Sequence, residues 1–415
     1  MALKYLYVPS GYKAGTAYGV LPNDSSADFD EFVRATYATR TNKDGLLESM
    51  GNNVPRLDYS DGGCPSLLLE GSSVNLCKYS EQIDSWGKNP NDGTVTVRAN
   101  EEISPDGNIT ADVVSVSTQY DGVYTQAITT VAESTYSCSA YVNHVSGSSK
   151  IRVGVTTYFY STTPTNPTKY IVIDLSNGSI ISNDVSSFAT AKVINAGNGW
   201  YRIIIENMTI PVGGGGNSNF VIYSYEDTFT EFSVWGGQIE INSQASSYIP
   251  NLSNGTTTRN DDIGNSAGDL SSYINSSEGV LEIKAKALFN GGSDVRIGIS
   301  DGTADNRINL SWREAENRMS IFMKANGGDV LDGGTVGFKN FTLTHDQTEM
   351  TTFKIKWKSG DIQVKLNNTI LLTQADTFTM TGLDQVSLGK GYGGSSLSFE
   401  GNLQYIKVYD SATDF

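Results

Sequence analysis

The stretch TTFKIKWKSGDIQVKLNNTILL, residues 351–372, indicates the fold class of this chain most directly. Phe353, Ile355 and Trp357 alternate with lysines, so an extended strand would carry apolar side chains on one face and charged ones on the other. The turn-forming Ser359-Gly360-Asp361 follows, and a second apolar-rich run comes after it. A hairpin with one apolar face predicts an antiparallel β-sandwich, in which that face packs on the core.

Similar runs recur along the chain, with turn-forming residues between them. Asn177-Gly178 lies between two apolar runs and predicts a tight hairpin. In the last run we expect Ile406 and Val408 to point into a core and Lys407 to point outward. The other runs occupy residues 122–130, 135–142, 150–162, 200–210, 232–241, 279–289, 294–301 and 317–325. Strands at this spacing predict an all-β fold: two antiparallel β-sandwich (jelly-roll) domains preceded by a short N-terminal hairpin segment.

Length and charge set the broad class. A chain of 415 residues is too long for one core, because single cores stop growing near ~250–300 residues. The net charge of −16 is spread over the sequence, and such a surface does not attract nucleic acid or anionic lipid. The three cysteines and two histidines show no disulfide framework and no zinc spacing. Near the N-terminus, a short apolar run meets Pro9 and Gly11 too early for the apolar region of a secretion signal, so we expect no such signal. No window of the sequence approaches 18 apolar residues, so we also expect no membrane-spanning segment.

Composition also suggests domain boundaries. Residues 1–60 hold a hairpin pattern around Lys43-Asp44-Gly45 but too few large apolar residues for a core, which predicts an attachment segment that packs on a neighbouring domain or chain. Residues 253–268 are polar and predict a linker. The expected sandwiches are therefore residues 61–252 and 269–415.

The tryptophans fall into two groups. Trp200, Trp235, Trp312 and Trp357 lie in apolar strand runs, and we expect all four in the cores. Trp86 follows a short polar segment, and the sequence leaves its exposure open.

Several strings together resemble a module of phage virion proteins, especially of phages that infect Bacteroidota. They are VRATYATRTNKDGLLE (33–48), PRLDYSDGGCPSLLLEGSSVNLCKYSEQIDSW (55–86), NGWYRIII (198–205), and VWGGQIEINSQASSYIPN (234–251) followed by TTTRNDD. The sandwich of that module is similar to carbohydrate-binding modules. The later strings EGVLEIKAKA (278–287) and EGNLQYIKVYDSA (400–412), with the hairpin between them, resemble a laminin G-like or concanavalin-like lectin domain. The resemblance implies a location on the virion surface, as a tail fibre, head fibre or head-decoration subunit.

A sugar-binding sandwich needs exposed aromatic rings, because the C–H-rich face of a pyranose stacks on them. In VGVTTYFYST, period-two alternation puts Tyr158 and Tyr160 on the face opposite the apolar one, and Tyr223 and Tyr225 repeat the arrangement. These four tyrosines are the candidate glycan platform. The alternative is that they are ordinary sheet residues or pack against another subunit.

One turn suggests a metal site. DGTADNR places Asp301 and Asp305 together, and lectin-like sandwiches sometimes bind Ca²⁺ through loop carboxylates. The turn lacks the full ligand spacing of a calcium loop, so a solvated turn is the alternative, and we expect no other cofactor.

The sequence predicts a non-enzymatic protein. Neither His144 nor His345 stands near a nucleophile motif, and no short repeat indicates a β-helix of the depolymerase kind. The expected function is adhesion to host-surface glycans. We expect a homo-oligomer that also contacts other virion proteins, and a trimer by analogy with phage fibres. A purely structural decoration protein and a polysaccharide depolymerase are the alternatives.

Overall fold

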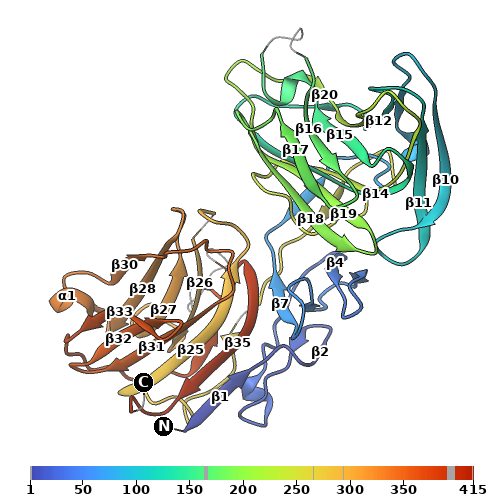
Figure 1. Ribbon diagram of the computed structural model, residues 1–415. Coiled ribbons are helices and arrows are strands. Elements are labelled where there is room, and N and C mark those ends of the chain that lie inside the picture. Colours follow the sequence, from blue (N-terminus) through green and yellow to red (C-terminus); the bar gives the residue numbers. More distant parts are fainter. Residues whose placement is uncertain (1, 163–166, 265, 293, 390–397, 414) are drawn as a thin grey trace. The chain divides into compact units, whose positions relative to one another are not determined.

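The computed structural model describes residues 2–162, 167–264, 266–292, 294–389, 398–413 and 415. It is almost entirely β, with antiparallel strand pairing, as predicted (Figure 1). The chain forms two compact units. Unit 1 comprises residues 1–43, 49–71 and 260–415, and unit 2 comprises residues 44–48 and 72–259. Among the described residues, no helix is long and apolar enough to cross a membrane.

Unit 1 contains two large sheets. The first has the order β33-β32-β31-β25-β35-β7-β6, with β1 also paired to β35. Its strands are β1 (Leu3–Tyr7), β6 (Arg56–Asp58), β7 (Ser66–Leu69), β25 (Glu278–Ala287), β31 (Thr351–Lys358), β32 (Ile362–Leu366), β33 (Thr369–Gln374) and β35 (Gly401–Tyr409). The second has the order β24-β34-β26-β27-β28-β29, with β30 on β28. Its strands are β24 (Ser266–Ala267), β26 (Val295–Ser300), β27 (Arg307–Trp312), β28 (Arg318–Ala325), β29 (Gly328–Asp329), β30 (Phe338–Thr342) and β34 (Gln385–Ser387).

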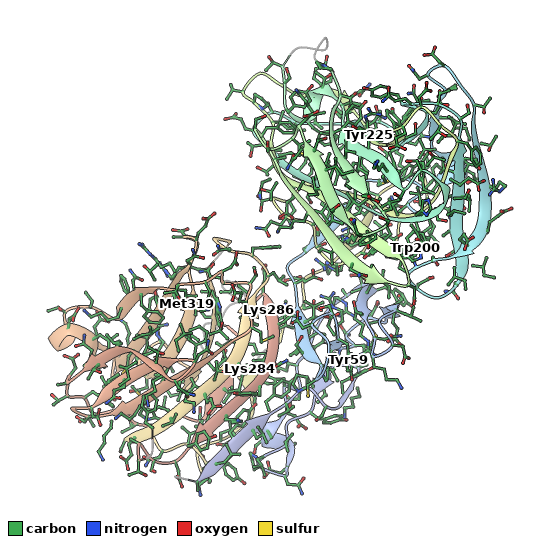
Figure 2. All side chains as sticks on the ribbon, viewed as in Figure 1. Tyr59, Trp200, Tyr225, Lys284, Lys286 and Met319 are labelled. Atoms are coloured by element: carbon green, nitrogen blue, oxygen red, sulfur yellow. The ribbon has the colours of Figure 1, made fainter. Side chains whose placement is uncertain are left out.

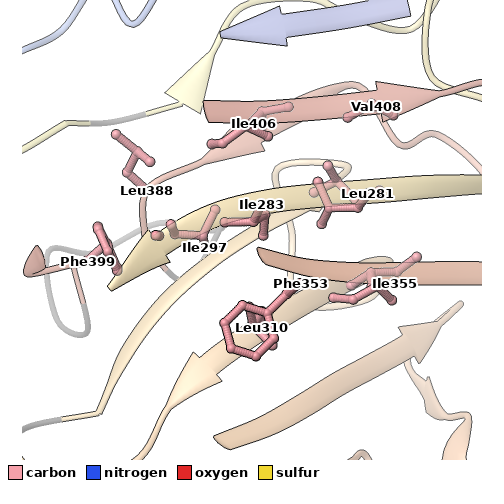
Figure 3. Packing of buried hydrophobic residues seen from close by; sticks show 14 of the residues in the cluster. Leu281, Ile283, Ile297, Leu310, Phe353, Ile355, Leu388, Phe399, Ile406 and Val408 are labelled. Atoms are coloured by element: carbon pink, nitrogen blue, oxygen red, sulfur yellow. The ribbon is translucent and has the colours of Figure 1, made fainter. Parts of the chain in front are cut away.

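The core of unit 1 follows from strand alternation. Phe353, Ile355 and Trp357 of β31 are buried in the same core as Ile406 and Val408 of β35, as predicted. Figure 3 labels Phe353, Ile355, Ile406 and Val408 among the packed side chains. Lys407 points outward and pairs with Glu282 at 3.2 Å. The faces of these strands therefore separate apolar from charged side chains as the sequence predicts.

Unit 2 contains two six-stranded sheets. One has the order β10-β11-β22-β14-β19-β18, from β10 (Val95–Ile103), β11 (Ile109–Val116), β14 (Thr135–Gly147), β18 (Thr190–Gly197), β19 (Trp200–Thr209) and β22 (Thr230–Glu240). The other has the order β17-β16-β15-β21-β12-β9, from β9 (Gly87–Asn89), β12 (Gly122–Tyr124), β15 (Lys150–Val155), β16 (Lys169–Asp174), β17 (Ser179–Asn183) and β21 (Phe220–Ser224). Their inner faces share one apolar core. The predicted hairpin at Asn177-Gly178 joins β16 to β17, with Gly178 at a φ of 74°.

Short elements complete the chain. They are β2 (Tyr12–Lys13), β3 (Thr16–Ala17), β4 (Ala38–Thr41), β5 (Leu47–Met50), β8 (Ser73–Asn75), β13 (Ile128–Thr129), β20 (Asn217–Ser218), β23 (Thr257–Arg259), the single helical turn α1 (Leu331–Gly334), and the 3₁₀ turns η1 (Ser25–Ala27), η2 (Ile83–Ser85) and η3 (Thr157–Phe159).

A buried ionic cluster ties three segments of unit 1 together. The Asp262 carboxylate accepts a hydrogen bond from Arg34 Nη1 at 2.7 Å and another from Arg56 Nη2. Arg56 Nη1 also pairs with Glu70 at 2.7 Å, and the Glu70 backbone N–H donates to Asp262 at 3.0 Å. Burial alone would lower the pKa of Arg56, but the charges of Asp262 and Glu70 outweigh it, so the pKa is raised. The guanidinium is thus held charged inside the protein.

The predicted domain boundaries need correction, because the N-terminal residues belong to unit 1. Figure 1 shows β1 beside β35, and Tyr5, Tyr7 and Phe29 lie in the core of unit 1. Residues 1–60 are therefore not a separate attachment segment, although they do pack on a neighbouring core as expected. The first sandwich likewise does not begin at residue 61, since β7 belongs to the first sheet of unit 1.

The predicted linker at residues 253–268 is also wrong. Thr257–Arg259 forms β23, which pairs with β8 in unit 2. In unit 1, Asp262 is buried in the ionic cluster, and Ala267 lies in the core. A polar composition alone predicts a loop, but here buried ion pairs and backbone pairing fix the polar residues in place.

All five tryptophans are buried. Trp200, Trp235, Trp312 and Trp357 lie in strands, as predicted. Trp86, which the sequence left open, is 3% exposed, and its Nε1–H donates to the Tyr79 carbonyl at 3.0 Å.

The ionic cluster makes Asp262 a sensitive position. We expect Asp262→Asn to destabilise unit 1 by about 3–5 kcal/mol, because two buried guanidinium groups lose their shared counter-ion. Lys358→Met, which breaks an ion pair with Glu278 in the same unit, is the control and should cost little because water screens that pair. Urea unfolding followed by tryptophan fluorescence measures both. Equal costs for the two variants would contradict the role given to Asp262.

Candidate functional site

The sheet of unit 2 that contains β15 and β21 has one apolar and one aromatic face. Val123, Val153, Ile171 and Ile222 point into the core of unit 2. Because side chains alternate along a strand, the residues next to them point the other way. That outer face carries Tyr124 of β12, Tyr223 of β21, Tyr170 of β16 and Arg152 of β15.

Each of these three tyrosines lies directly opposite a glycine of the neighbouring strand. The pairs are Tyr124 with Gly87, Tyr223 with Gly122, and Tyr170 with Gly154. A Cβ atom placed on the glycine would come within 2.2 Å, 2.8 Å and 2.6 Å, respectively, of the facing ring. Real Cβ atoms do not approach so closely, so the rings occupy the space that only glycine leaves free. The tyrosines therefore lie down across the adjacent strand instead of projecting from the sheet.

Two further tyrosines extend this surface. The Tyr170 ring centroid lies 6.1 Å from that of Tyr223 and 6.2 Å from that of Tyr120. Tyr225, which is labelled in Figure 2, follows β21, and its ring contacts the guanidinium of Arg152 on the outer face. We call the set Tyr120, Tyr124, Tyr170, Tyr223 and Tyr225 the tyrosine face. Tyr120 is 37% exposed and Tyr223 9% exposed, and the other three are half-buried.

The ring edges of the tyrosine face are polar. Burial raises the pKa of Tyr170 and of Tyr223, so both phenols are neutral at physiological pH and can donate or accept hydrogen bonds. Two side-chain amides bind the backbone of the tyrosine face: Asn89 Nδ2 donates to the Tyr120 carbonyl at 2.9 Å, and Gln119 Nε2 donates to the Tyr225 carbonyl at 2.8 Å. The surface thus combines aromatic rings with hydrogen-bonding groups.

Arg152 lies among the rings. Its Nη1 donates to the carbonyls of Ser224 at 2.8 Å and Tyr225 at 3.1 Å. Its Cζ atom lies 3.9 Å from the Tyr120 ring centroid and 4.6 Å from that of Tyr225. Both distances are within the range of cation–π attraction. These contacts fix the guanidinium in the tyrosine face.

The structure separates the four tyrosines that the sequence grouped. Tyr223 and Tyr225 lie in the tyrosine face, but the strand assigned to Tyr158 and Tyr160 ends at Val155 and is followed by the turn η3. The Tyr158 ring lies against Gly216, and the Tyr160 ring stacks on Phe188 with centroids 4.7 Å apart. Their placement on a strand face is therefore wrong, because the period-two pattern continued past the point where the backbone leaves the sheet.

Sequence reasoning missed Tyr120, Tyr124, Tyr170 and Arg152. Tyr124 and Tyr170 each fall in a short apolar run, where they resemble ordinary strand residues. The signal that distinguishes them is the glycine opposite each one, and that signal appears only when the pairing register is known.

In the turn predicted to bind calcium, the carboxylate of Asp301 accepts hydrogen bonds from other residues of the same turn. Asp301 accepts hydrogen bonds from Thr303 N at 2.9 Å, from Thr303 Oγ1 at 2.7 Å and from Asn306 Nδ2 at 2.8 Å. Burial raises the pKa of Asp301, but these hydrogen bonds outweigh it and lower the pKa overall. Among the described residues, no group of three or more His, Cys, Asp or Glu side chains is placed to hold a metal ion. Calcium binding by Asp301 and Asp305 stays a prediction.

Comparisons with known proteins give structural similarities only. No protein-family model and no curated protein matches the chain. Solved structures similar to it include the carbohydrate-binding module CBM40 of the Ruminococcus gnavus IT-sialidase bound to α2,3-sialyllactose, with 18% identity and a TM-score of 0.29 over 35% of this chain and 86% of that one. Domains LG4–5 of the mouse laminin α1 chain match with 10% identity and a TM-score of 0.25 over 70% and 89%. The CBM22 tandem of Paenibacillus barcinonensis Xyn10C matches with 9% identity and a TM-score of 0.26 over 82% and 99%. Values this low carry no argument about function, and the β-sandwich assignment rests on the strand pairing.

The glycine opposite Tyr124 offers a direct test of the packing. The three atoms that a Cβ on Gly87 would approach most closely all belong to the Tyr124 side chain, so we expect Gly87→Ala to push that ring off the sheet and to cost about 1–3 kcal/mol. Gly255→Ala, in an exposed loop of the same unit, is the control and should change stability by less than about 0.5 kcal/mol. Chemical unfolding measures the stability. The packing would be refuted by a Gly87→Ala protein as stable as the control.

Asp384, which lies beside the turn that contains Asp301, gives a prediction about the pH dependence of stability. Burial, together with the charges of Asp269 and Asp301, raises the pKa of Asp384. Because folding then disfavours the ionised form, the carboxylate lowers stability at neutral pH, and the penalty disappears as the pH falls below the ordinary value of 3.8. We expect Asp384→Asn to raise the Tm at pH 7 by on the order of 1 °C and to have no effect near pH 3. The exposed Asp30→Asn is the control, and a lower Tm for Asp384→Asn at pH 7 would contradict this sign.

Proposed function

We propose that this chain is a non-enzymatic glycan-binding protein and that the tyrosine face of unit 2 is its binding surface. The observation that carries the proposal is the set of three tyrosine rings lying over facing glycines. Rings that lie along a sheet present their faces, and the C–H-rich side of a pyranose stacks on such faces. Neighbouring amides and phenols supply partners for the sugar hydroxyls.

The geometry also favours binding because it keeps the loss of side-chain entropy small. Each ring is held by the strand beneath it, so few side-chain rotations are lost when a sugar binds. Single stacking contacts are weak, and the tyrosine face offers only a few rings. Useful affinity therefore requires many copies displayed together, because linked sites gain avidity.

The sequence resemblance to phage virion proteins supports a location for this function on the virion surface. We propose that the chain is a fibre, tail or head-decoration subunit on the virion surface, present as a homo-oligomer, where it contacts host-surface glycans and other virion proteins. Multiple copies on one particle would supply the avidity that weak sites need.

One alternative is favoured by the same surface. Tyrosine is enriched at protein interfaces, so the tyrosine face would equally suit a decoration protein that binds other virion proteins. No specific feature of the described residues supports the depolymerase alternative. Each histidine ring is hydrogen-bonded to a neighbouring residue: His144 to the Gly147 carbonyl, and His345 to Thr351 Oγ1.

The proposal is tested by replacing two rings. Tyr124→Ala combined with Tyr170→Ala should weaken binding to a glycan identified on an array by roughly tenfold or more, since each stacking ring contributes about 0.5–1.5 kcal/mol. Tyr158→Ala removes a tyrosine of the same unit outside the face and is the matched control. Calorimetric titration measures affinity, and thermal melting checks folding.

Two outcomes would contradict the proposal. Unchanged affinity in a folded double variant would mean that sugars bind elsewhere. A change in oligomeric state without a change in glycan affinity would assign the face to a protein interface, as the decoration alternative requires.

A further inference from the structure

Arg152 is a buried cation that forms no salt bridge within the described part of the chain. It is 7% exposed, and it forms no ion pair with any carboxylate of the described residues. Its neighbour on the strand, Lys150, pairs with Glu226 at 2.7 Å, and the buried Arg34 and Arg56 of unit 1 share Asp262. Since buried charges are normally paired, the exception marks a place where an anion from outside would be stabilised.

The hydrogen bonds of Arg152 leave one edge of the guanidinium free. Both bonds to backbone carbonyls use Nη1. The Nε–Nη2 edge makes no hydrogen bond to the described residues, and neither atom is among those sealed from solvent. Two parallel N–H groups on one edge match the two oxygens of a carboxylate.

The surroundings favour an anion at this edge. The rings of Tyr120 and Tyr225 hold the guanidinium in place, so its orientation is set before a ligand arrives. Burial lowers the pKa of Arg152, and Asp184 makes the smallest of the opposing electrostatic contributions, after Tyr120, Tyr170 and Tyr225. Arginine nevertheless stays protonated at physiological pH, so the positive charge persists.

We propose that the tyrosine face selects sugars that carry a carboxylate, such as uronic or sialic acids, with the carboxylate bound to the Nε–Nη2 edge of Arg152 and the sugar ring stacked on an adjacent tyrosine. This inference rests on the proposed function and specifies its ligand class. Sulfated sugars share the negative charge, and a tetrahedral oxyanion can also bind an arginine edge through two oxygens, so a sulfated sugar belongs in the ligand series.

The experiment compares ligands that differ only in the carboxylate. Full-length protein is titrated with oligogalacturonate and with its methyl ester, then with sialyllactose, lactose and sulfated lactose. We expect at least one carboxylated sugar to bind about tenfold or more tightly than its neutral partner, because a charged hydrogen-bonded pair is lost with the ester or the neutral sugar. Arg152→Gln should bind both members of that pair with the same weak affinity. Arg98→Gln removes a positive charge from the other sheet of unit 2, and it should keep the preference.

The possible results are distinguishable. If the wild type binds neutral and carboxylated partners within twofold, the inference fails while the proposed function stands. If it binds no sugar of either kind, both fail. Tighter binding of sulfated lactose than of sialyllactose and oligogalacturonate would overturn the assignment to a carboxylate. Should Arg152→Gln not fold, Arg152→Lys keeps the charge without the two-pronged edge, and an undiminished carboxylate preference in that variant would count against the inference.

Discussion

Strand register is the constraint on which both units depend. In an antiparallel sheet the register decides which residues face each other, and a shift by one residue moves every side chain to the opposite face. In unit 1 it places Phe353 and Ile355 in the core and the neighbouring lysines on the opposite face of the sheet. In unit 2 it sets Tyr124 opposite Gly87 and Tyr170 opposite Gly154, and without that pairing the rings would not lie along the sheet.

Buried polar contacts supply a second level of organisation. Arg56 and Glu70 meet Asp262, which lies far from both in the sequence, inside unit 1. A similar network forms in unit 2, where Glu240 accepts hydrogen bonds from Ser73 at 2.5 Å and from the Ser246 N–H at 3.0 Å. Burying such groups is costly unless every partner is present, so these contacts favour one arrangement of segments over others.

Patterns within a short stretch of sequence predict individual strands and tight turns of this structure. Alternation identified the β31 strand and the inward positions Ile406 and Val408, and the Asn177-Gly178 pair identified a hairpin. Such patterns do not predict which strands pair when they are far apart in the sequence. The N-terminal residues contribute β1 to a sheet that also contains β35, and nothing in their own composition indicates that partner. Residues 253–268 looked like a linker because buried ion pairs use the same residue types as exposed loops.

The candidate site shows the same limit. Tyr223 and Tyr225 were found because they alternate with apolar residues, whereas Tyr158 and Tyr160 were misplaced because the strand ends before them. Tyr124 and Tyr170 gain their role from glycines on other strands, which no single segment reveals.

Selective ¹³C labelling of the tyrosine rings, followed by NMR during titration with a bound glycan, tests the central claim most directly. Binding at the tyrosine face predicts shifts of the ring signals of Tyr120, Tyr124, Tyr170 and Tyr225, with the core residues Tyr5, Tyr7 and Tyr136 unchanged. Saturation with glycan while the signals of the tyrosine face stay still would show that this surface is not where the sugar binds.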